Sequence, residues 1–300
     1  MSQALGGRIA GALAVPVAEP VRVFARRLAE AVGACAVLFY GSNLRTGELE
    51  GVLDFYLLRA GPRETGIWPR VSYHEWESGG QTLRAKAATM TLAMFRAAAA
   101  GETLDTTIWT RFTQPAALVW ASDDGAAGEV AAAVVKATAT AARLAAALGP
   151  ASGAEPDYWR ALFRETYAAE FRVEKAGREE SILTLNAAHF AGLLPLALEA
   201  AGIACEREEE MITPMIAPAE RRRLLRWWRR RRRLGKPYNL VRLVRASATF
   251  DGAARYAAWK IERHSGVALA LTPWQERHPL LAAPGALWRV WRIRQGQRRP

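Results

Sequence analysis

The most informative stretch of this 300-residue sequence reads Cys35-Ala-Val-Leu-Phe-Tyr-Gly-Ser42 and continues, after a polar loop, as Gly51-Val-Leu-Asp-Phe-Tyr-Leu-Leu58. Each half contains a short apolar run bounded by glycine and polar residues, which is typical of a buried strand. The pattern therefore predicts two neighbouring strands, the first ending in Gly41-Ser42 and the second carrying Asp54.

Further helices and strands are predicted on both sides of this pair. Helical spacing of apolar residues, alanine-rich runs and Gly or Pro stop signals predict helices over residues 20–33, 90–100, 125–148, 158–172 and 189–201. Short apolar runs predict strands over residues 81–89 and 116–121. Residues 151–156 are predicted to be a linker, and residues 206–218 a loop.

The predicted fold class is α+β, or α/β, with three parts. Residues 20–125 would form a mixed sheet with helices, residues 126–218 a helical domain, and residues 219–300 a basic amphipathic region. The composition, 51% hydrophobic and 23% charged, is that of a globular protein and excludes disordered and collagen-like chains.

Charge is distributed very unevenly along the chain. Residues 221–300 hold 21 of the 41 Lys and Arg but only 3 of the 29 acidic residues, whereas the rest of the chain is net acidic. Such a division predicts a folded body followed by a segment that contacts an anionic surface.

The two cysteines, Cys35 and Cys205, lie in separate stretches without metal-ligand spacing. This spacing indicates neither a disulfide framework nor a zinc site and favours a reducing compartment. Because arginines interrupt the apolar N-terminus and no run of 18 apolar residues occurs, we expect no membrane-spanning segment and no signal peptide.

The strand, Gly-Ser turn and acidic second strand resemble the palm of nucleotidyltransferases. Chemistry explains that layout, because Gly41 lets the backbone approach a triphosphate, Ser42 can donate to a phosphate oxygen, and Asp54 can hold Mg²⁺. The usual palm has a second carboxylate two residues later, where this chain has Tyr56. The residues alone leave the second metal ligand open among Glu48, Glu50, Glu75, Glu77 and Asp105. A turn followed by an edge strand also remains a possible interpretation.

Several separate stretches resemble one family, the mitochondrial-type phosphatidate cytidylyltransferases, also known as translocator assembly and maintenance proteins. The matching stretches are Tyr40-Gly-Ser42 with Leu53-Asp-Phe55, Leu83-Arg-Ala-Lys86, Trp109-Thr-Arg-Phe-Thr-Gln-Pro115, Tyr167-Ala-Ala-Glu-Phe-Arg172, Asn186-Ala-Ala-His-Phe190, and Arg242 to Phe250 with Tyr256 and Lys260. The family pattern also has an apolar residue in place of the second carboxylate. The resemblance covers about residues 30–265, and it implies Mg²⁺-dependent transfer of a cytidylyl group from CTP to phosphatidate.

Two polyanionic substrates require fixed cations, and Lys86, Arg111 and Arg172 are the candidates. Lys86 is predicted to balance triphosphate charge, although a surface lysine is the alternative, and Arg111 fits a packed structural arginine equally well. Tyr167 is predicted to help bind substrate from its helix. His189 is predicted to have a binding or structural role, because the attacking phosphate is already ionised and needs no general base.

The basic block at residues 221–233 reads Arg-Arg-Arg-Leu-Leu-Arg-Trp-Trp-Arg-Arg-Arg-Arg-Arg, and residues 288–294 repeat the mixture of Trp and Arg. Interleaved Trp and Arg favour a membrane interface, where indole lies at headgroup depth and guanidinium meets lipid phosphate. Nucleic acid is the less favoured partner, because no nucleic-acid-binding motif occurs. A solvated basic face is the third interpretation.

The favoured function from the sequence is therefore phosphatidate cytidylyltransferase activity at a membrane surface, with CTP, phosphatidate and Mg²⁺. The expected location is the bacterial cytoplasm, peripheral on the inner face of the membrane. The alternatives are a nucleotidyltransferase with another acceptor, such as a sugar phosphate or RNA, and a non-catalytic palm-fold protein that binds membranes or RNA.

Overall fold

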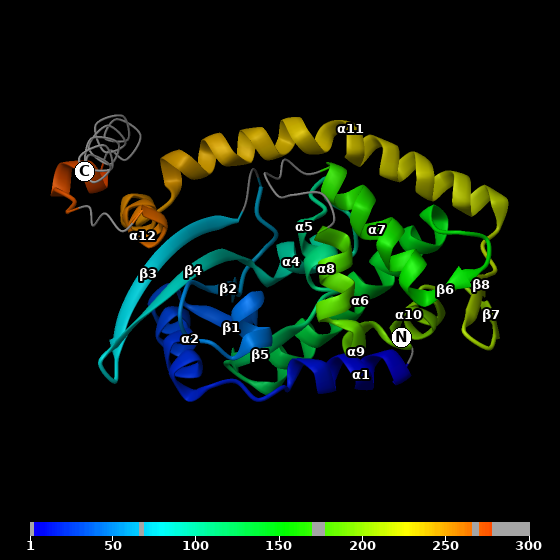
Figure 1. Cartoon of the computed structure of the whole chain (residues 1–300), viewed down its shortest axis with the longest axis horizontal. Helices are drawn as coiled ribbons and strands as arrows, with labels where there is room; N and C mark the ends of the chain where they lie inside the picture. Colours follow the sequence, from blue (N-terminus) through cyan, green and yellow to red (C-terminus); the bar gives the residue numbers. More distant parts are fainter. Residues whose placement is uncertain (1–2, 66–68, 170–177, 266–269, 278–300) are drawn as a thin grey trace, which may run out of the picture.

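The computed structural model describes residues 3–65, 69–169, 178–265 and 270–277. It is a mixed α+β structure, 57% helical and 20% strand, built around a five-stranded sheet. The sheet and α2 occupy one end of the molecule and the helices α6 to α10 the other (Figure 1). The predicted α+β class is thereby confirmed at this level.

The central sheet has the strand order β3-β4-β2-β1-β5. Its β2 and β4 are parallel, and every other pair is antiparallel. The strands are β1 (Ala34–Tyr40), β2 (Leu53–Arg59), β3 (Arg70–Ser78), β4 (Gln81–Thr91) and β5 (Ala116–Ala121).

Four of these strands were predicted from their apolar runs, and the prediction is confirmed for β1, β2, β4 and β5. The edge strand β3 was missed, because polar and charged residues such as Glu75 and Glu77 alternate with its half-buried ones. An edge strand is covered less completely than a central strand and therefore carries a weaker apolar signal.

The two faces of the sheet are covered by different helices. One face packs against α2 (Glu19–Val32), whose apolar residues Val21, Phe24 and Leu28 meet Phe39 and Phe55 of the strands. The other face packs against α4 (Leu92–Ala99), α5 (Thr107–Arg111) and α6 (Asp124–Leu148). The predicted helices at 20–33, 90–100 and 125–148 are confirmed.

The hydrophobic core continues from the sheet into the helical half, because α6 packs against both. The remaining helices there are α1 (Gln3–Leu13), α7 (Glu155–Ala169), α8 (Arg178–Leu185), α9 (Ala187–Phe190) and α10 (Leu193–Ala200). The core therefore runs without a break from the sheet into these helices.

Three local predictions in this half were wrong. Residues 151–156 are not a linker, because β6 (Gly153–Ala154) pairs with β8 (Met211–Pro214). Most of the loop expected over 206–218 is instead a hairpin of β7 (Cys205–Glu208) and β8, and only residues 215–217 before α11 are irregular. The helix expected over 189–201 is divided at Gly192, whose φ of 71° cannot continue a right-handed helix.

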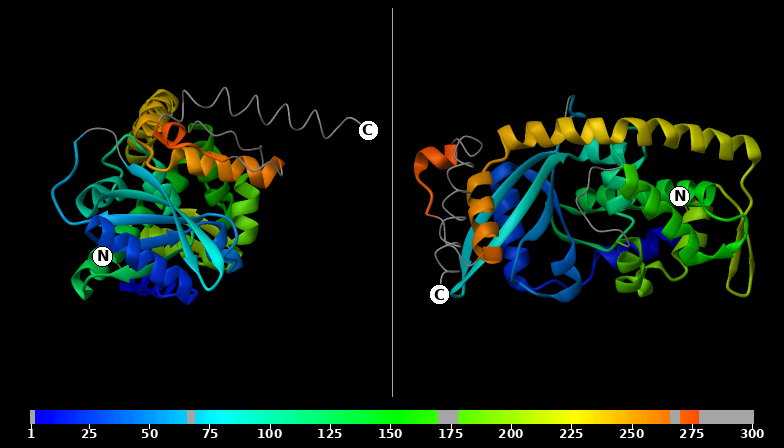
Figure 2. Two further views of the ribbon diagram at one scale, coloured as in Figure 1. Left: turned by 90° about the vertical axis from the view of Figure 1, so that its left-hand side faces the viewer. Right: turned by 45° about the horizontal axis from the view of Figure 1, so that its top comes forward.

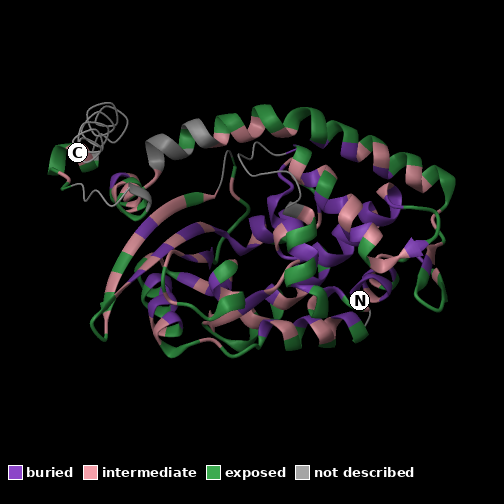
Figure 3. Ribbon diagram, in the orientation of Figure 1, coloured by how far each residue is buried: buried purple, intermediate pink, exposed green. Residues whose placement is uncertain are grey.

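The basic block forms part of one long helix, α11 (Pro218–Thr249), which runs along the side of the whole molecule (Figures 1 and 2). It leads to α12 (Ala253–Ser265) beside β3 and to the short α13 (Pro273–Arg277). Where the burial of its residues is described, the outer side of α11 is largely exposed (Figure 3).

The tryptophans of the block do not face outward. Trp228 is 2% exposed and contacts Trp109 at a ring-centroid distance of 6.4 Å, and Trp227 lies 5.9 Å from the same ring. Arg231 is also buried, donates to the carbonyl oxygens of Gly101 and Thr103, and has its pKa lowered to about 10 by burial. This part of the block therefore anchors α11 to the protein. The repeat at 288–294 lies outside the described residues.

One helix in the described part of the chain, α6, is long and apolar enough to cross a membrane, and 72% of its apolar window is buried inside the protein. The segment Glu179–Leu185 with Ala187–Ala200 passes the same test only as a pair bent by 82°. Burial of this kind is what a core helix of a globular protein also shows.

Candidate functional site

A row of polar side chains crosses the face of the sheet that α5 covers. Asp54 on β2 is the register partner of Lys86 on the parallel β4 and of Tyr40 on β1, and Lys86 is in turn the partner of Tyr73 on β3. Register partners project from the same face of a sheet. The structure thus places Asp54 and Lys86, which are 32 residues apart in the sequence, side by side.

Gly41 ends β1 directly beside Asp54. Its φ of 97° and ψ of −163° are conformations that residues with a side chain rarely adopt. A Cβ atom added to Gly41 would lie 3.2 Å from Asp54 Oδ2. The glycine therefore lets the backbone at the end of β1 pass close to the carboxylate.

The turn after Gly41 is held by the short helix α3 (Ser42–Thr46). The exposed Ser42 hydroxyl donates to Asn43 Oδ1 at 3.3 Å. The buried Asn43 side chain donates to the carbonyl oxygens of Glu48 and Glu50, and this fixes the loop back toward β2. Ser42 is thus exposed next to Gly41 at the end of the strand, and its role as a phosphate donor stays a prediction.

Asp54 and Lys86 are partly desolvated, which perturbs both groups. Burial raises the pKa of the Asp54 carboxyl, while Lys86 and Arg111 act in the opposite direction. Burial lowers the pKa of the Lys86 ammonium, Asp54 opposes this, and the charges of Arg111, Lys260 and Arg242 lower it further. Carboxylates and lysines shifted in this way by burial and by a specific partner are typical of functional sites.

Arg111 at the end of α5 is fixed between two tyrosines. Its Nη1 donates to Tyr40 Oη at 3.3 Å and to Tyr56 Oη at 3.2 Å, and its guanidinium carbon lies 4.8 Å from the centroid of the Tyr40 ring. Burial raises the pKa of both tyrosines, which remain neutral hydroxyl groups. Tyr56, at the position where the sequence analysis looked for a second carboxylate, therefore accepts a hydrogen bond from a cation.

Residues of the C-terminal helices complete the site, and we did not predict them as site residues. Arg242 on α11 and Lys260 on α12 both act electrostatically on Lys86. Arg263 Nη1 lies 3.1 Å from the position of a Cβ on Gly51, in the loop that leads to β2. Their basic character was visible in the sequence, but it could not be separated from the general positive charge of this region.

The turn into α12 is bonded to the sheet, which explains how these residues reach the site. Tyr73 N donates to the carbonyl oxygen of Asp251 at 2.8 Å, and Ser72 and Asp251 form a β-bridge. Gly252 has a φ of 77°, and a Cβ there would lie 2.8 Å from Tyr73 O. The ring of Tyr256 packs 5.4 Å from that of Tyr73.

The carboxylates considered as second metal ligands are mostly engaged elsewhere. Asp105 is 4% exposed, pairs with Arg242 at 2.9 Å and accepts from Thr107. Glu75 accepts from the Tyr73 hydroxyl and pairs with Arg84, and Glu77 accepts from Thr82. Glu48 and Glu50 are exposed. Among the described residues, no group of three or more His, Cys, Asp or Glu side chains could hold a metal ion.

A Mg²⁺ ion fits this site only together with a polyanionic ligand. Magnesium is commonly bound through one or two carboxylates plus substrate phosphates and water. Asp54 supplies one carboxylate next to the backbone of Gly41. The chain would hold the ion through Asp54, and phosphate oxygens and water would complete its coordination.

The remaining predicted residues lie apart from this cluster or outside the described chain. Tyr167 lies on α7 and packs against the hydrophobic core. Arg172 falls outside the described residues. His189 Nε2 donates to the carbonyl oxygen of Thr113 at 2.9 Å, and burial lowers the pKa of its ring. His189 therefore has the structural role that was one of its two predicted roles.

Comparison with known proteins adds no assignment, because the sequence matches no family model and no curated protein.

Proposed function

We propose that this protein transfers a cytidylyl group from CTP to phosphatidate and thereby forms CDP-diacylglycerol and pyrophosphate. The observation that carries the proposal is the grouping of Lys86 and Arg111 next to Asp54, with Arg242 and Lys260 near enough to act on Lys86. Even with Asp105 paired to Arg242, these four cations outnumber the two carboxylates. Cations in this excess favour a polyanion. The resemblance of this chain to phosphatidate cytidylyltransferases, described above, selects cytidylyl transfer among the reactions of polyanionic substrates.

In the proposed reaction a phosphate oxygen of phosphatidate attacks the α-phosphorus of CTP. A new P–O bond forms, the bond from the α-phosphorus to the oxygen bridging to the β-phosphate breaks, and pyrophosphate leaves with that electron pair. Gly41 would admit the triphosphate, Ser42 would donate to a phosphate oxygen, and Lys86 and Arg111 would balance its charge. Magnesium, when bound at Asp54, would neutralise charge on the phosphates.

Residues outside the sheet would also bind substrate. Arg242 and Lys260 would bind the second phosphate-bearing substrate from the C-terminal helices, because their charges act on Lys86. Tyr167 and Arg172 remain predictions from the sequence. Because phosphatidate stays in a bilayer, the enzyme would act as a peripheral protein on the inner face of a bacterial membrane.

The test is transfer of label from CTP into lipid. Purified protein is incubated with Mg²⁺, labelled CTP and phosphatidate in mixed micelles, in parallel with labelled ATP, GTP and UTP. We expect label in the lipid fraction from CTP alone, and a loss of roughly 100-fold or more with Asp54→Ala. Glu208→Ala, which removes an exposed carboxylate on β7, is the matched control and should retain activity.

The outcomes separate the alternatives. Label from another nucleotide, or transfer only to a sugar phosphate or RNA added in place of phosphatidate, would replace the proposed substrates. Absence of transfer from folded protein with every nucleotide and acceptor would leave a non-catalytic binder and contradict the proposal.

A further inference from the structure

The arginines of α11 divide into two sets. Arg221, Arg223, Arg231 and Arg232 are bonded within the protein, to main-chain carbonyl oxygens or to Glu220 and Glu165. The other set is Arg222, Arg226, Arg229, Arg230 and Arg233. In the part of the chain that the structure describes, none of this second set pairs with a carboxylate.

The second set occupies one side of the helix. Residues spaced by three, four, seven or eight positions share a face, and the positions 222, 226, 229, 230 and 233 follow this spacing. Pro237, Leu240 and Val241 continue the same face at positions 15, 18 and 19 after Arg222. Leu240 is 52% and Val241 50% exposed. The outer face of α11 is therefore densely cationic over its first half, and further on it carries the exposed Lys236 beside the apolar Pro237, Leu240 and Val241. It extends for about 30 Å.

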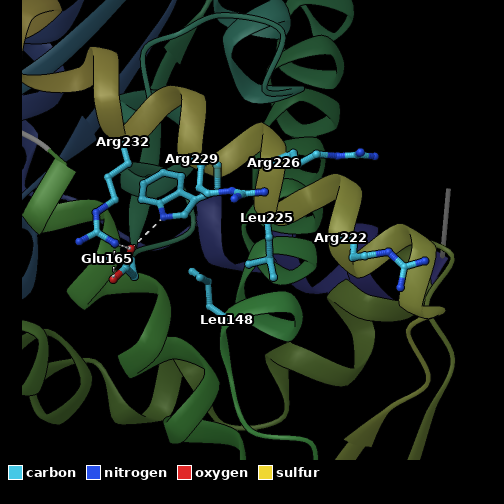
Figure 4. A pocket seen from close by; sticks show the side chains of 8 residues that line it. Leu148, Glu165, Arg222, Leu225, Arg226, Arg229 and Arg232 are labelled. Carbon is cyan, nitrogen blue, oxygen red and sulfur yellow. Dashed lines mark hydrogen bonds and ion pairs between the residues drawn. The ribbon is translucent and has the colours of Figure 1, made fainter.

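The cationic half is grooved rather than smooth. A groove of about 590 Å³ lies between α11 and the ends of α6 and α7, with Leu148 and Leu225 as apolar lining and Arg222, Arg226 and Arg229 among its charged residues. Arg232 and Glu165 also line this groove and form an ion pair there (Figure 4). A second groove of about 380 Å³ is lined by arginines of the same face and Leu234. None of the residues lining either groove belongs to the cluster around Asp54.

We propose that the outer face of α11 is a docking surface for a bilayer rich in anionic phospholipids. The arginines would bind headgroup phosphates in the grooves, and Leu240 and Val241 would contact the acyl boundary. Guanidinium matches phosphate in charge and geometry, and exposed aliphatic side chains gain free energy from leaving water. Trp227 and Trp228, which the sequence had suggested as the membrane-facing residues of the block, pack against the core instead, and Trp228, at 2% exposure, reaches only the lining of the first groove.

The exposed Leu240 and Val241 on this face favour a bilayer over nucleic acid. A nucleic-acid backbone requires cations along the contact, and it offers an exposed Leu-Val pair no apolar partner. A bilayer offers both kinds of contact within a few ångströms of depth. The proposal does not depend on the chemistry at Asp54.

The test is sedimentation of the full chain with vesicles of phosphatidylcholine alone and vesicles that also contain phosphatidylglycerol, without CTP or phosphatidate. We expect binding to the anionic vesicles only, and release as salt rises to about 1 M, where the Debye length falls to about 3 Å. Each arginine near an anionic surface contributes about 1 kcal/mol, or roughly fivefold in affinity. The variant Arg226→Gln/Arg229→Gln/Arg233→Gln should therefore bind roughly 100-fold more weakly.

A matched control removes the same charge elsewhere. The variant Arg59→Gln/Arg70→Gln/Arg207→Gln replaces three exposed arginines outside α11 and should bind within about twofold of the wild type. The variant Leu240→Ser/Val241→Ser should bind anionic vesicles several-fold more weakly than the wild type. This ratio should be the same at every salt concentration. All the replaced side chains are exposed, so equal urea midpoints would verify that each variant is folded.

Three results would overturn the proposal. They are equal binding of both triple variants, equal sedimentation of the wild type with both kinds of vesicle, or retention of the protein by duplex RNA in preference to anionic vesicles. Asp54→Ala should bind vesicles like the wild type. A chain that docks without transferring label would therefore contradict the proposed function and leave the docking surface intact.

Discussion

Replacing Trp228 by alanine should strongly destabilise the protein, although the residue lies in the most basic part of the chain. The indole is 2% exposed, packs against Trp109, and donates from Nε1 to Glu165 Oε2 at 2.9 Å. Truncation of a buried Trp to Ala typically costs about 3–5 kcal/mol, because apolar contacts are lost and a cavity remains. We expect a loss of about 4 kcal/mol in the free energy of unfolding for Trp228→Ala.

Urea unfolding followed by far-UV circular dichroism measures this loss as a lower midpoint at unchanged slope. Trp228→Phe retains most of the apolar contacts but not the hydrogen bond, so it should lose about 1–2 kcal/mol. Arg230→Ala, at an exposed position two residues away, should change the free energy of unfolding by less than about 0.5 kcal/mol.

The opposite pattern would refute the placement of α11. If Trp228→Ala unfolded at the wild-type urea concentration and lost binding to anionic vesicles, the indole would belong to a membrane interface and not to the core. The docking face of α11 would then include Trp228 as well as the arginines, Leu240 and Val241.

Three further predictions concern the site and its supports. Gly41→Ala should lower the free energy of unfolding by about 1–3 kcal/mol, because the φ of 97° suits glycine and the new Cβ would lie 3.2 Å from Asp54 Oδ2. Urea midpoints will measure this loss. Asp105→Ala should lower the free energy of unfolding by about 3 kcal/mol or more, because Arg242 loses its carboxylate partner at 2.9 Å. Asp105→Asn should lower it less, and equal urea midpoints for the two variants would contradict this. Burial lowers the pKa of the His189 ring below its usual 6.5 in the folded protein. As the pH falls below 6.5, the unfolded chain therefore binds more protons than the folded chain, and the stability contributed by the neutral ring is lost. His189→Gln should therefore lose less stability than the wild type between about pH 7 and about pH 5, and parallel pH profiles would count against the buried neutral ring.

Interactions between residues close in sequence account for most of what was predicted correctly. The apolar runs of β1, β2, β4 and β5 and the alanine-rich α6 depend on the period of burial along one segment, and this period is visible without knowledge of the neighbours. The Gly-Ser turn after β1 and Asp54 on β2 were also predicted to lie close together, because one short loop joins the two strands. The sequence also showed that the last 80 residues carry the positive charge.

The local predictions are wrong where a segment has a weak apolar pattern and its structure depends on hydrogen bonds to a distant segment. The strand β3 and the hairpin of β7 and β8 are rich in polar residues, and hydrogen bonding to a neighbouring strand made them strands. The break at Gly192 depends on a backbone conformation that glycine permits but does not require.

The sequence by itself determined the main helices and strands, the loop that joins Gly41 to Asp54, and the concentration of arginines near the C-terminus. Only the tertiary structure decided which side chains meet, as for Lys86 beside Asp54, and which arginines remain on the surface. Arg231 and Arg230 are adjacent and chemically identical, yet one is buried against Gly101 and the other is exposed. The physical reason is that helical periodicity divides a uniformly basic segment into faces, while packing against distant residues chooses the face that is buried.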